Sequence, residues 1–300
     1  MEKYFILHML TATPNVSPFD VNMAYDSGYN AVMPYANVNL DQVSALTQDA
    51  IFSRGTKGVK RTAIFIGGRE IGLAADMLDA ARRAMVPPFE VSVFADPSGA
   101  FTTAAGMVAC VEKQLKKIHQ TDLRGKNVVV LGGTGPVGAA AAVLASQAGA
   151  RVRIASHTSA TRARVISEVV NARYGTTTEP GDASVVDTKL DLIKDADIIL
   201  GAAKAGIQVF SAQELASAKR LLVAADVNAV PPAGIEGVGM MDDGAPLAAG
   251  SGRAVGIGAL AIGNIKYQVQ RGLLEAMIAA EKPIYIDFRD AFAAARKLTA

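Results

Sequence analysis

The sequence predicts an α/β protein made of two α/β domains, the second a Rossmann-like nucleotide-binding domain. Apolar runs of strand length alternate with helical patterns along the whole chain. A glycine-rich loop directly follows one apolar strand and directly precedes an apolar helix. Three hundred residues suit two domains of ordinary size. We expect residues 1–120 and C-terminal helices over 270–300 to form the first domain, residues 121–269 to form the second, and a cleft to lie between them.

Composition and charge argue against several classes of protein. The net charge of +2 implies neither nucleic acid nor an anionic membrane as a partner. A single cysteine, Cys110, excludes an intrachain disulfide framework and a zinc site of several cysteines, and it fits a reducing compartment. The first apolar run is interrupted by His8 and is too short to span a membrane. We therefore expect a cytoplasmic protein without a metal site.

The first 120 residues predict successive strand–helix pairs. Ser17 as N-cap, Pro18 at the first helical position and Gly28 at the end delimit the first helix. Pro34 suits the edge or the end of a strand. The expected strands are 3–10, 31–38, 61–68 and 89–96, and the expected helices are 17–28, 40–52, 70–85 and 102–119.

The second half of the chain begins after a polar linker over 120–127. Strands are expected over 126–132, 150–156, 197–203 and 220–228, with helices over 136–149, 161–175, 184–196 and 211–218. Residues 229–263 are rich in Gly, Pro and Ala and predict no element. Two closing helices are expected over 265–282 and 285–300.

The glycine-rich loop fits the pattern G-x-G-x-x-G of a dinucleotide-binding turn. Its residues are Gly133, Thr134, Gly135, Pro136, Val137 and Gly138. In this motif the first glycine makes the tight turn, the second lets the backbone approach a pyrophosphate, and the third lets the helix pack on the strand. The helix N-terminus then faces the anion. We expect NADP or NAD to bind here.

The end of the second strand of this domain indicates which dinucleotide is preferred. A site for NAD usually has Asp or Glu at this position, whereas this chain has Ser156, His157 and Thr158, followed by Arg162. Hydroxyls and an arginine can hold a 2′-phosphate. The sequence therefore favours NADP and leaves NAD possible, and Arg153, inside the strand, is expected to be structural.

Further candidate residues follow the ends of other strands. Ala203 and Gly206, in a Gly-rich turn, and Asn228, after the next strand, are expected near the nicotinamide half of the cofactor. Substrate contacts are expected from Phe19, Asp20, Ser98, Thr102, Thr103 and Lys266. Each also has an ordinary structural explanation: helix capping, a dipole partner, or the core.

Several long segments closely resemble the NAD(P)-dependent methylene-tetrahydromethanopterin dehydrogenases of methylotrophic bacteria. They include SPFDVNMAYDSG, FADPSGAFTTAAGMVA, GGTGPVG, DVNAVPPAGI and VGIGALAIGNIKYQ, and the resemblance covers nearly the whole chain. The chain looks most like the type B form, which accepts both NAD and NADP. The strictly NADP-dependent relative has a Gly-Arg-Lys cluster where this chain has Ser156-His157-Thr158, which puts strict NADP selectivity in doubt.

The resemblance implies oxidation of 5,10-methylene-tetrahydromethanopterin to the 5,10-methenyl cation, with NAD(P)⁺ taking a hydride, in the pterin-linked oxidation of formaldehyde. It implies homo-oligomers, with a trimer expected. Within it, Asp20 would favour the developing positive charge as a catalytic residue, Lys266 would grip the pterin, and Phe19 would stack on the pterin ring. Hydride leaves a carbon between two nitrogens and no proton moves, so a catalytic acid–base pair is not required.

Three other functions remain open at this point. Methylene-tetrahydrofolate shares the reacting ring and could be the true substrate. A shikimate-type or amino-acid dehydrogenase would need a Lys–Asp pair in the first domain, for which Lys3 and Lys57 are poorly placed. A non-catalytic NAD(P) sensor would bind nucleotide without turning over any pterin.

Overall fold

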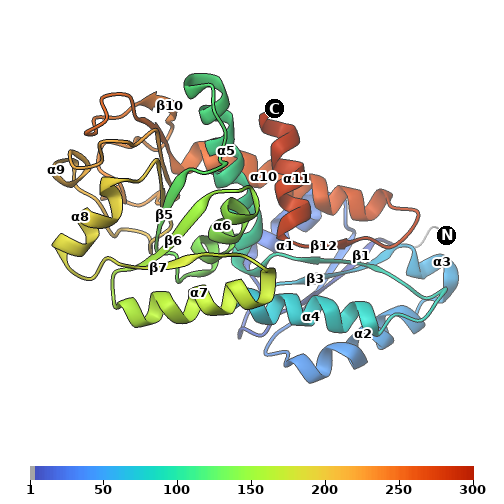
Figure 1. Cartoon of the computed structure of the whole chain (residues 1–300). Helices are drawn as coiled ribbons and strands as arrows, with labels where there is room; N and C mark the ends of the chain where they lie inside the picture. Colours follow the sequence, from blue (N-terminus) through green and yellow to red (C-terminus); the bar gives the residue numbers. More distant parts are fainter. Residues whose placement is uncertain (1–3) are drawn as a thin grey trace. The chain divides into compact units, whose positions relative to one another are not determined.

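The computed structural model describes residues 4–300 and divides the chain into two compact units. Unit 1 comprises Met1–Thr102 and Tyr267–Ala294, and unit 2 comprises Thr103–Lys266 and Ala295–Ala300. All three divisions fall inside helices, α5 (Ala100–His119), α10 (Ala259–Ala279) and α11 (Phe288–Thr299), whereas the sequence suggested a division in the polar linker near residue 120. Each unit has its own sheet with covering helices, which confirms the predicted α/β class (Figure 1).

Unit 1 is built on a five-stranded parallel sheet with the order β12-β4-β3-β1-β2. Its strands are β1 (Ile6–Leu10), β2 (Ala31–Tyr35), β3 (Thr62–Ile66), β4 (Ser92–Ala95) and β12 (Tyr285–Ile286). Its further elements are α1 (Pro18–Asp26), η1 (Leu40–Gln42), α2 (Val43–Phe52), α3 (Gly55–Val59), α4 (Ile71–Arg83), η2 (Pro97–Gly99) and α11 (Phe288–Thr299), which ends in unit 2.

The burial of the strands of unit 1 agrees with this order. Every residue of the central strand β3 is buried, as expected for a parallel strand covered on both faces. Phe65 of β3 and Phe94 of β4 meet edge to face, with ring centroids 5.4 Å apart. Pro34 lies in β2 at the edge of the sheet, where a missing backbone N–H removes no ladder bond.

The C-terminal segment corrects one prediction. Tyr285 and Ile286 were expected to begin a helix but form β12, which pairs with β4. The backbone N–H of Val93 donates to the carbonyl of Ile284 at 2.9 Å. A two-residue strand has no hydrophobic period, so only the partner strand specifies it.

Unit 2 is built on a seven-stranded sheet with the order β10-β11-β9-β8-β5-β6-β7. The edge strand β10 pairs antiparallel with β11, and the six strands from β11 to β7 are parallel and follow the order of a Rossmann fold. The strands are β5 (Asn127–Leu131), β6 (Arg151–Ser156), β7 (Glu179–Asp182), β8 (Ile198–Gly201), β9 (Val223–Asp226), β10 (Asp243–Pro246) and β11 (Val255–Ile257). The remaining helices are α6 (Pro136–Gln147), α7 (Ala160–Tyr174), α8 (Val186–Lys194) and α9 (Ala212–Leu215).

Three strands of unit 2 were not predicted. Strand β7 has the sequence EPGD, in which Pro180 and Gly181 argue against a strand, and β10 and β11 lie in the unassigned segment 229–263. All three lie at or next to an edge of the sheet. Pro180 is tolerated because β7 pairs with β6 alone.

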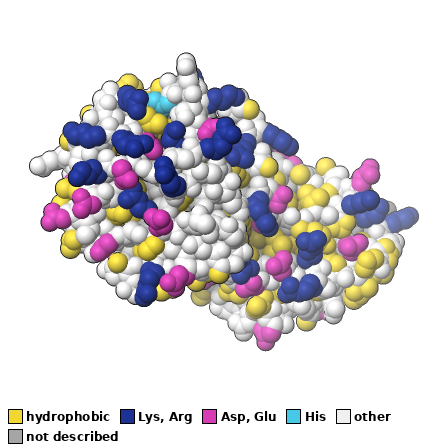
Figure 2. Space-filling view, in the orientation of Figure 1, with side chains coloured by type: hydrophobic (Ala, Val, Ile, Leu, Met, Phe, Trp, Pro, Cys, Tyr) yellow, Lys and Arg dark blue, Asp and Glu magenta, His cyan; other side chains and the backbone are white. Residues whose placement is uncertain are grey.

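The surface agrees with the modest net charge. Figure 2 shows Lys and Arg side chains interspersed with Asp and Glu across the face drawn. Among residues 4–300, no helix is both long enough and apolar enough to cross a membrane.

Candidate active site

The glycine-rich loop after β5 makes its tight turn one residue earlier than the motif suggested. Gly132 has φ +74°, and a Cβ at this position would collide with the carbonyl of Ala202. A Cβ on Gly133 would lie 2.8 Å from the carbonyl of Val130. Gly132 therefore makes the left-handed turn assigned above to Gly133, and Gly133 packs tightly against the strand it leaves.

The surroundings of Gly135 and Gly138 differ. A Cβ on Gly138 would lie 2.5 Å from the carbonyl oxygen of Gly132 and 2.6 Å from the Cα of Gly133, so α6 packs on the loop only through glycine. Gly135 is the N-cap of α6 with ordinary dihedral angles, and its Cβ would meet only the carbonyl of Gly132, at 3.3 Å. The fold itself therefore demands glycine at 138 but tolerates a methyl at 135.

This geometry fits a dinucleotide. The loop after β5 and the loop after β8 lie at the point where the strand order reverses, which is where open α/β sheets bind their ligands. Thr134, Pro136 and Val137 are half-buried around the N-terminus of α6, whose first backbone N–H groups have no partner inside the helix. A pyrophosphate would use these N–H groups, and it would lie over Gly135, the one glycine of the motif that the fold does not require.

The carboxyl end of β6 presents a mixture of buried and exposed polar groups. Ser156 is buried, and its Oγ accepts from the backbone N–H groups of Thr158 at 3.2 Å and Ser159 at 3.4 Å. Ser159 caps α7 through the backbone N–H of Arg162, at 3.2 Å. The side chains of His157, Thr158 and Arg162 are exposed. Ser156 therefore orders the loop, and its Oγ also lies 2.9 Å from Oγ1 of the exposed Thr158. The side chains of His157 and Arg162 are open to solvent.

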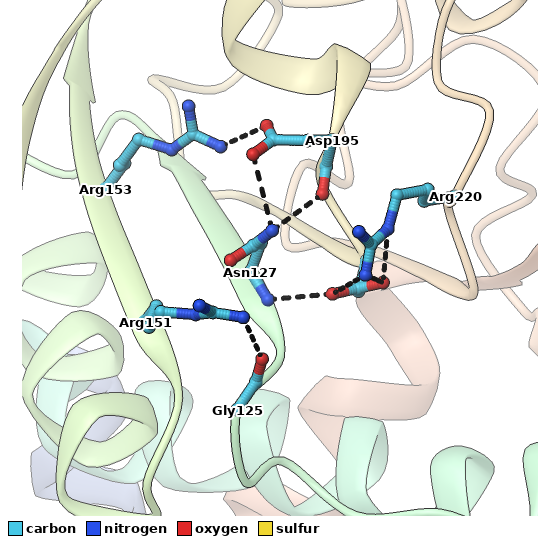
Figure 3. Close-up of polar contacts among 7 residues, drawn as sticks. Gly125, Asn127, Arg151, Arg153, Asp195 and Arg220 are labelled. Atoms are coloured by element: carbon cyan, nitrogen blue, oxygen red, sulfur yellow. Dashed lines mark hydrogen bonds and ion pairs between the residues drawn. The ribbon is translucent and has the colours of Figure 1, made fainter.

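Arg153 is structural, as expected. Its guanidinium pairs with Asp195, and Asn127 of the neighbouring strand donates to the backbone carbonyl of Asp195 at 3.0 Å (Figure 3). Asp197 accepts from the backbone of Asn127 at 2.9 Å and pairs with Arg220. These contacts join the amino-terminal ends of β5 and β8, the edge of the sheet opposite the glycine loop.

Asn228 is held by hydrogen bonds within unit 2. Its Oδ1 accepts from the backbone N–H groups of Gly206 at 3.1 Å and Val230 at 3.0 Å, and its Nδ2 donates to the carbonyl of Pro232 at 2.8 Å. The side chain is buried and ties the loops after β8 and β9 together. Gly206 (φ +79°) and the half-buried Ala203 lie on the loop that Asn228 holds.

Unit 1 contains a cavity of about 430 Å³ at the carboxyl end of its sheet. The sheet order reverses between β1 and β3, and the loops after these two strands form the walls. The lining residues are Met9, Leu10, Thr11, Thr13, Pro14, Asn15, Val16, Ser17, Pro18, Asp20, Phe65, Gly67, Gly68, Arg69 and Ser98. The volume is in the range of small-molecule sites.

Asp20 is the buried acid of this cavity. It lies in the first turn of α1, is 3% exposed, and accepts a hydrogen bond from Nε2 of Gln270 at 2.7 Å. Gln270, on α10, is fully buried. Phe19 lies between two lining residues, Pro18 and Asp20, and its ring is 45% exposed.

The turn after β4 contributes Ser98 but not Thr102. Ser98 lines the cavity with a left-handed backbone (φ +53°), and its hydroxyl donates to the carbonyl of Gly68 at 2.7 Å. Thr102 is fully buried, and its hydroxyl donates to Asp96 at 2.6 Å, so it belongs to the cap of α5. The half-buried Thr103 belongs to unit 2.

Lys266 is half-buried on α10 in unit 2, one helical turn before Gln270. Residues four apart share a helix face. A Cβ on Gly106 of α5 would lie 3.3 Å from the backbone nitrogen of Lys266, so this glycine permits close approach of α5 to α10.

Comparison with known proteins identifies the family. Residues 18–98 match the family described as methylene-tetrahydromethanopterin dehydrogenase, N-terminal. The chain is 48% identical over 287 residues, covering 96% of both chains, to the NAD(P)-dependent methylenetetrahydromethanopterin dehydrogenase of Methylorubrum extorquens. The chain belongs to this family. It is also 31% identical over 274 residues, 91% of each chain, to the bifunctional protein MdtA of the same organism.

Solved structures agree at the level of fold. Shikimate 5-dehydrogenase from Listeria monocytogenes shares 14% identity and a TM-score of 0.53, covering 94% of this chain and 93% of its own. At this identity the likeness supports the two-domain α/β architecture and nothing about the substrate.

The sequence alone did not single out several residues of the glycine loop, of α10 and of the cavity of this methylene-tetrahydromethanopterin dehydrogenase family member. Gly132 directly precedes the motif, and Gln270 follows Lys266 by one turn in a predicted helix. Their spacing from residues already selected could therefore have identified both. Thr11, Asn15 and Arg69 follow the ends of β1 and β3. The sequence signal for these three residues is that each follows a strand. Many residues follow strands, so this signal selects them only once the order of the strands in the sheet is known.

Proposed function

We propose that this chain catalyses hydride transfer from 5,10-methylene-tetrahydromethanopterin to NAD(P)⁺, giving 5,10-methenyl-tetrahydromethanopterin. The observation that carries the proposal is the 48% identity to a dehydrogenase of that name along 96% of both chains. The dinucleotide loop of unit 2 and the cavity of unit 1 supply the two kinds of site that this reaction needs.

The residues of unit 1 would hold and stabilise the reacting pterin. The methenyl product carries a positive charge shared by two nitrogens, and the carboxylate of Asp20 in the cavity would favour that charge as it develops. The half-exposed ring of Phe19 offers an apolar face on which a pterin can stack. Ser98, Thr103 and Lys266 are proposed as further contacts, with Lys266 orienting the substrate rather than moving a proton.

The residues of unit 2 would hold the dinucleotide, which accepts the hydride when bound. The motif residues Gly133 to Gly138 would bind the pyrophosphate, while Ala203 and Gly206 line the path of the nicotinamide ribose. Thr158, His157 and Arg162 are exposed at the end of β6, without a carboxylate from that strand end to repel a phosphate. We propose that NADP and NAD both bind, with NADP favoured by Arg162.

The compartment, metabolic role and oligomeric state of the enzyme are proposed from the same family membership. We propose that it is cytoplasmic, acts in one-carbon metabolism and formaldehyde oxidation during methylotrophy, and forms a homo-oligomer, with a trimer as the first state to test. Sedimentation of the purified chain would decide the subunit number.

The test is an anaerobic absorbance assay with the full-length protein. Methylene-tetrahydromethanopterin and methylene-tetrahydrofolate would each be paired with NADP⁺ and NAD⁺, and both the methenyl product and the reduced nicotinamide would be followed. Turnover of the methanopterin substrate with little or none of the folate is expected. Preferred turnover of the folate would assign the alternative dehydrogenase activity, and NADP⁺ binding with no turnover of either pterin would favour a sensor.

A further inference from the structure

Gln270 joins helix α10 to the buried acid of the cavity in unit 1. It is fully buried on α10, and its amide donates to Oδ1 of Asp20, 250 residues earlier in the chain, at 2.7 Å. Asp20 is itself buried and lines the cavity of unit 1. A buried carboxylate is costly unless hydrogen bonds satisfy its oxygens.

The choice of an amide here has a chemical consequence. A lysine or arginine at position 270 could also donate to Asp20, but it would place a positive charge beside the carboxylate. The glutamine amide donates at every physiological pH and is uncharged, so this hydrogen bond orients the carboxylate without itself adding a positive charge. The other ionisable groups to consider are Arg69, which lines the same cavity, and Lys266, one turn earlier on α10.

We propose that Gln270 is a positioning residue of the hydride-transfer site: its amide keeps Asp20 ionised and in one orientation toward the cavity, ready to favour a substrate cation. This inference rests on the proposed function, because it gives Asp20 its task. A purely structural glutamine would affect the stability of unit 1 but would leave the chemical step unchanged.

Two substitutions at one position separate these roles. Gln270→Leu removes this one hydrogen bond to Asp20 at all pH values. Gln270→Glu is nearly isosteric, and it donates to Asp20 only while it is protonated. Two facing carboxyl groups share one proton at low pH, because two adjacent negative charges repel each other, and they lose that proton as the pH rises. The matched control is Gln268→Glu, the same change at an exposed position two residues earlier on α10.

The experiment measures kcat and KM of the full-length protein for methylene-tetrahydromethanopterin from pH 5.5 to 9, with the Kd for NADP⁺ as a check on folding. For Gln270→Leu we expect kcat to fall by about ten- to a hundredfold, the range for losing a hydrogen bond to a charged group. The change in KM should be much smaller, and the Kd should be unchanged. For Gln270→Glu, the ratio of its kcat to that of the unsubstituted protein should fall as pH rises, while Gln268→Glu shows a constant ratio.

Three other outcomes would overturn the proposal, each for a different reason. If kcat is kept in Gln270→Leu and only the melting temperature falls, the residue is structural. If the ratio for Gln270→Glu does not change with pH, the hydrogen bond does not govern the charge of Asp20. If the unsubstituted protein turns over no pterin at all, the proposed function fails and this inference fails with it.

Discussion

At the scale of single residues, the same type of side chain takes opposite roles within a few positions. Ser156 and Thr158 both carry hydroxyls at the end of β6, yet Ser156 is buried in the loop and Thr158 is exposed. Thr102 is buried in a helix cap, whereas Ser98, four residues earlier, lines the cavity. Residue type and distance from a strand end predict the neighbourhood of a site, but the direction of each side chain depends on local hydrogen bonds.

The choice of cofactor can be tested on one pair of arginines. Arg162 and Arg164 are both exposed on α7, but only Arg162 lies in its first turn, beside the end of β6. We expect Arg162→Ala to weaken NADP⁺ binding by about ten- to a hundredfold, since a charge-assisted bond to the 2′-phosphate is lost. NAD⁺ binding should change little. Calorimetric titration of both nucleotides against both variants measures this, and equal losses in Arg162→Ala and Arg164→Ala would rule out the assignment.

The single cysteine gives a second test at this scale. Cys110 is 2% exposed, and burial raises the pKa of its thiol to about 12. At pH 8 its thiolate fraction should be smaller than that of a free cysteine by on the order of a thousandfold. Ellman's reagent should therefore report no thiol in the native protein at pH 8 and one in guanidinium chloride. Rapid labelling of the native protein would show that α5 opens readily around Cys110.

At the scale of elements, long strands and helices were predictable and short ones were not. Strand β5 and helix α6 have uninterrupted apolar patterns, and both were predicted to within a few residues. Strand β7 contains Pro180 and Gly181, and β12 has two residues. Such strands form because a neighbouring strand offers free backbone groups, which is information that lies elsewhere in the chain.

The glycine loop permits a matched comparison within one element. Gly138→Ala should lower the free energy of unfolding by about 2 kcal/mol, because its methyl would overlap the backbone of Gly132 and Gly133. Gly135→Ala should cost less than about 1 kcal/mol, since its methyl meets one carbonyl at 3.3 Å. Gly135→Ala should nevertheless bind NADP⁺ at least about tenfold more weakly, because the methyl stands where a pyrophosphate approaches the backbone.

Chemical denaturation and nucleotide titration of both variants decide this. If Gly135→Ala bound NADP⁺ as tightly as the unsubstituted protein, the pyrophosphate would not lie against this turn.

At the scale of the whole molecule, the sequence indicated two α/β domains and a Rossmann-like second domain, and it left the strand order open. The orders β12-β4-β3-β1-β2 and β10-β11-β9-β8-β5-β6-β7 are set by crossover connections that no local pattern reveals. Because the cavity lies where the first order reverses, its lining residues Thr11, Asn15 and Arg69 could not be selected in advance. Asp20 could, because it lies in a segment that resembles the family.

The C-terminal segment should be essential for unit 1. Strand β12 pairs with β4, and the ring of Phe288 lies 5.3 Å from that of Phe101 in the core. Ending the chain after Ala279 should lower the free energy of unfolding by at least about 3 kcal/mol, as for the loss of a large buried side chain. Thermal melting followed by circular dichroism would compare it with a chain ending after Lys297, which keeps β12 and Phe288. Equal melting temperatures would show that unit 1 folds without them.

The way the chain passes between the two units sets the order in which they can finish folding during protein synthesis. Nearly all of unit 2 is one continuous stretch, Thr103–Lys266, whereas unit 1 needs residues up to Ala294. As the chain leaves the ribosome from its N-terminus, unit 2 can fold while β1 to β4 still await their last strand. Until then β4 has an open edge, the kind of surface on which newly made chains aggregate. Strands β1 to β4, which are made before unit 2, thus gain their last partner strand only after unit 2 has been made.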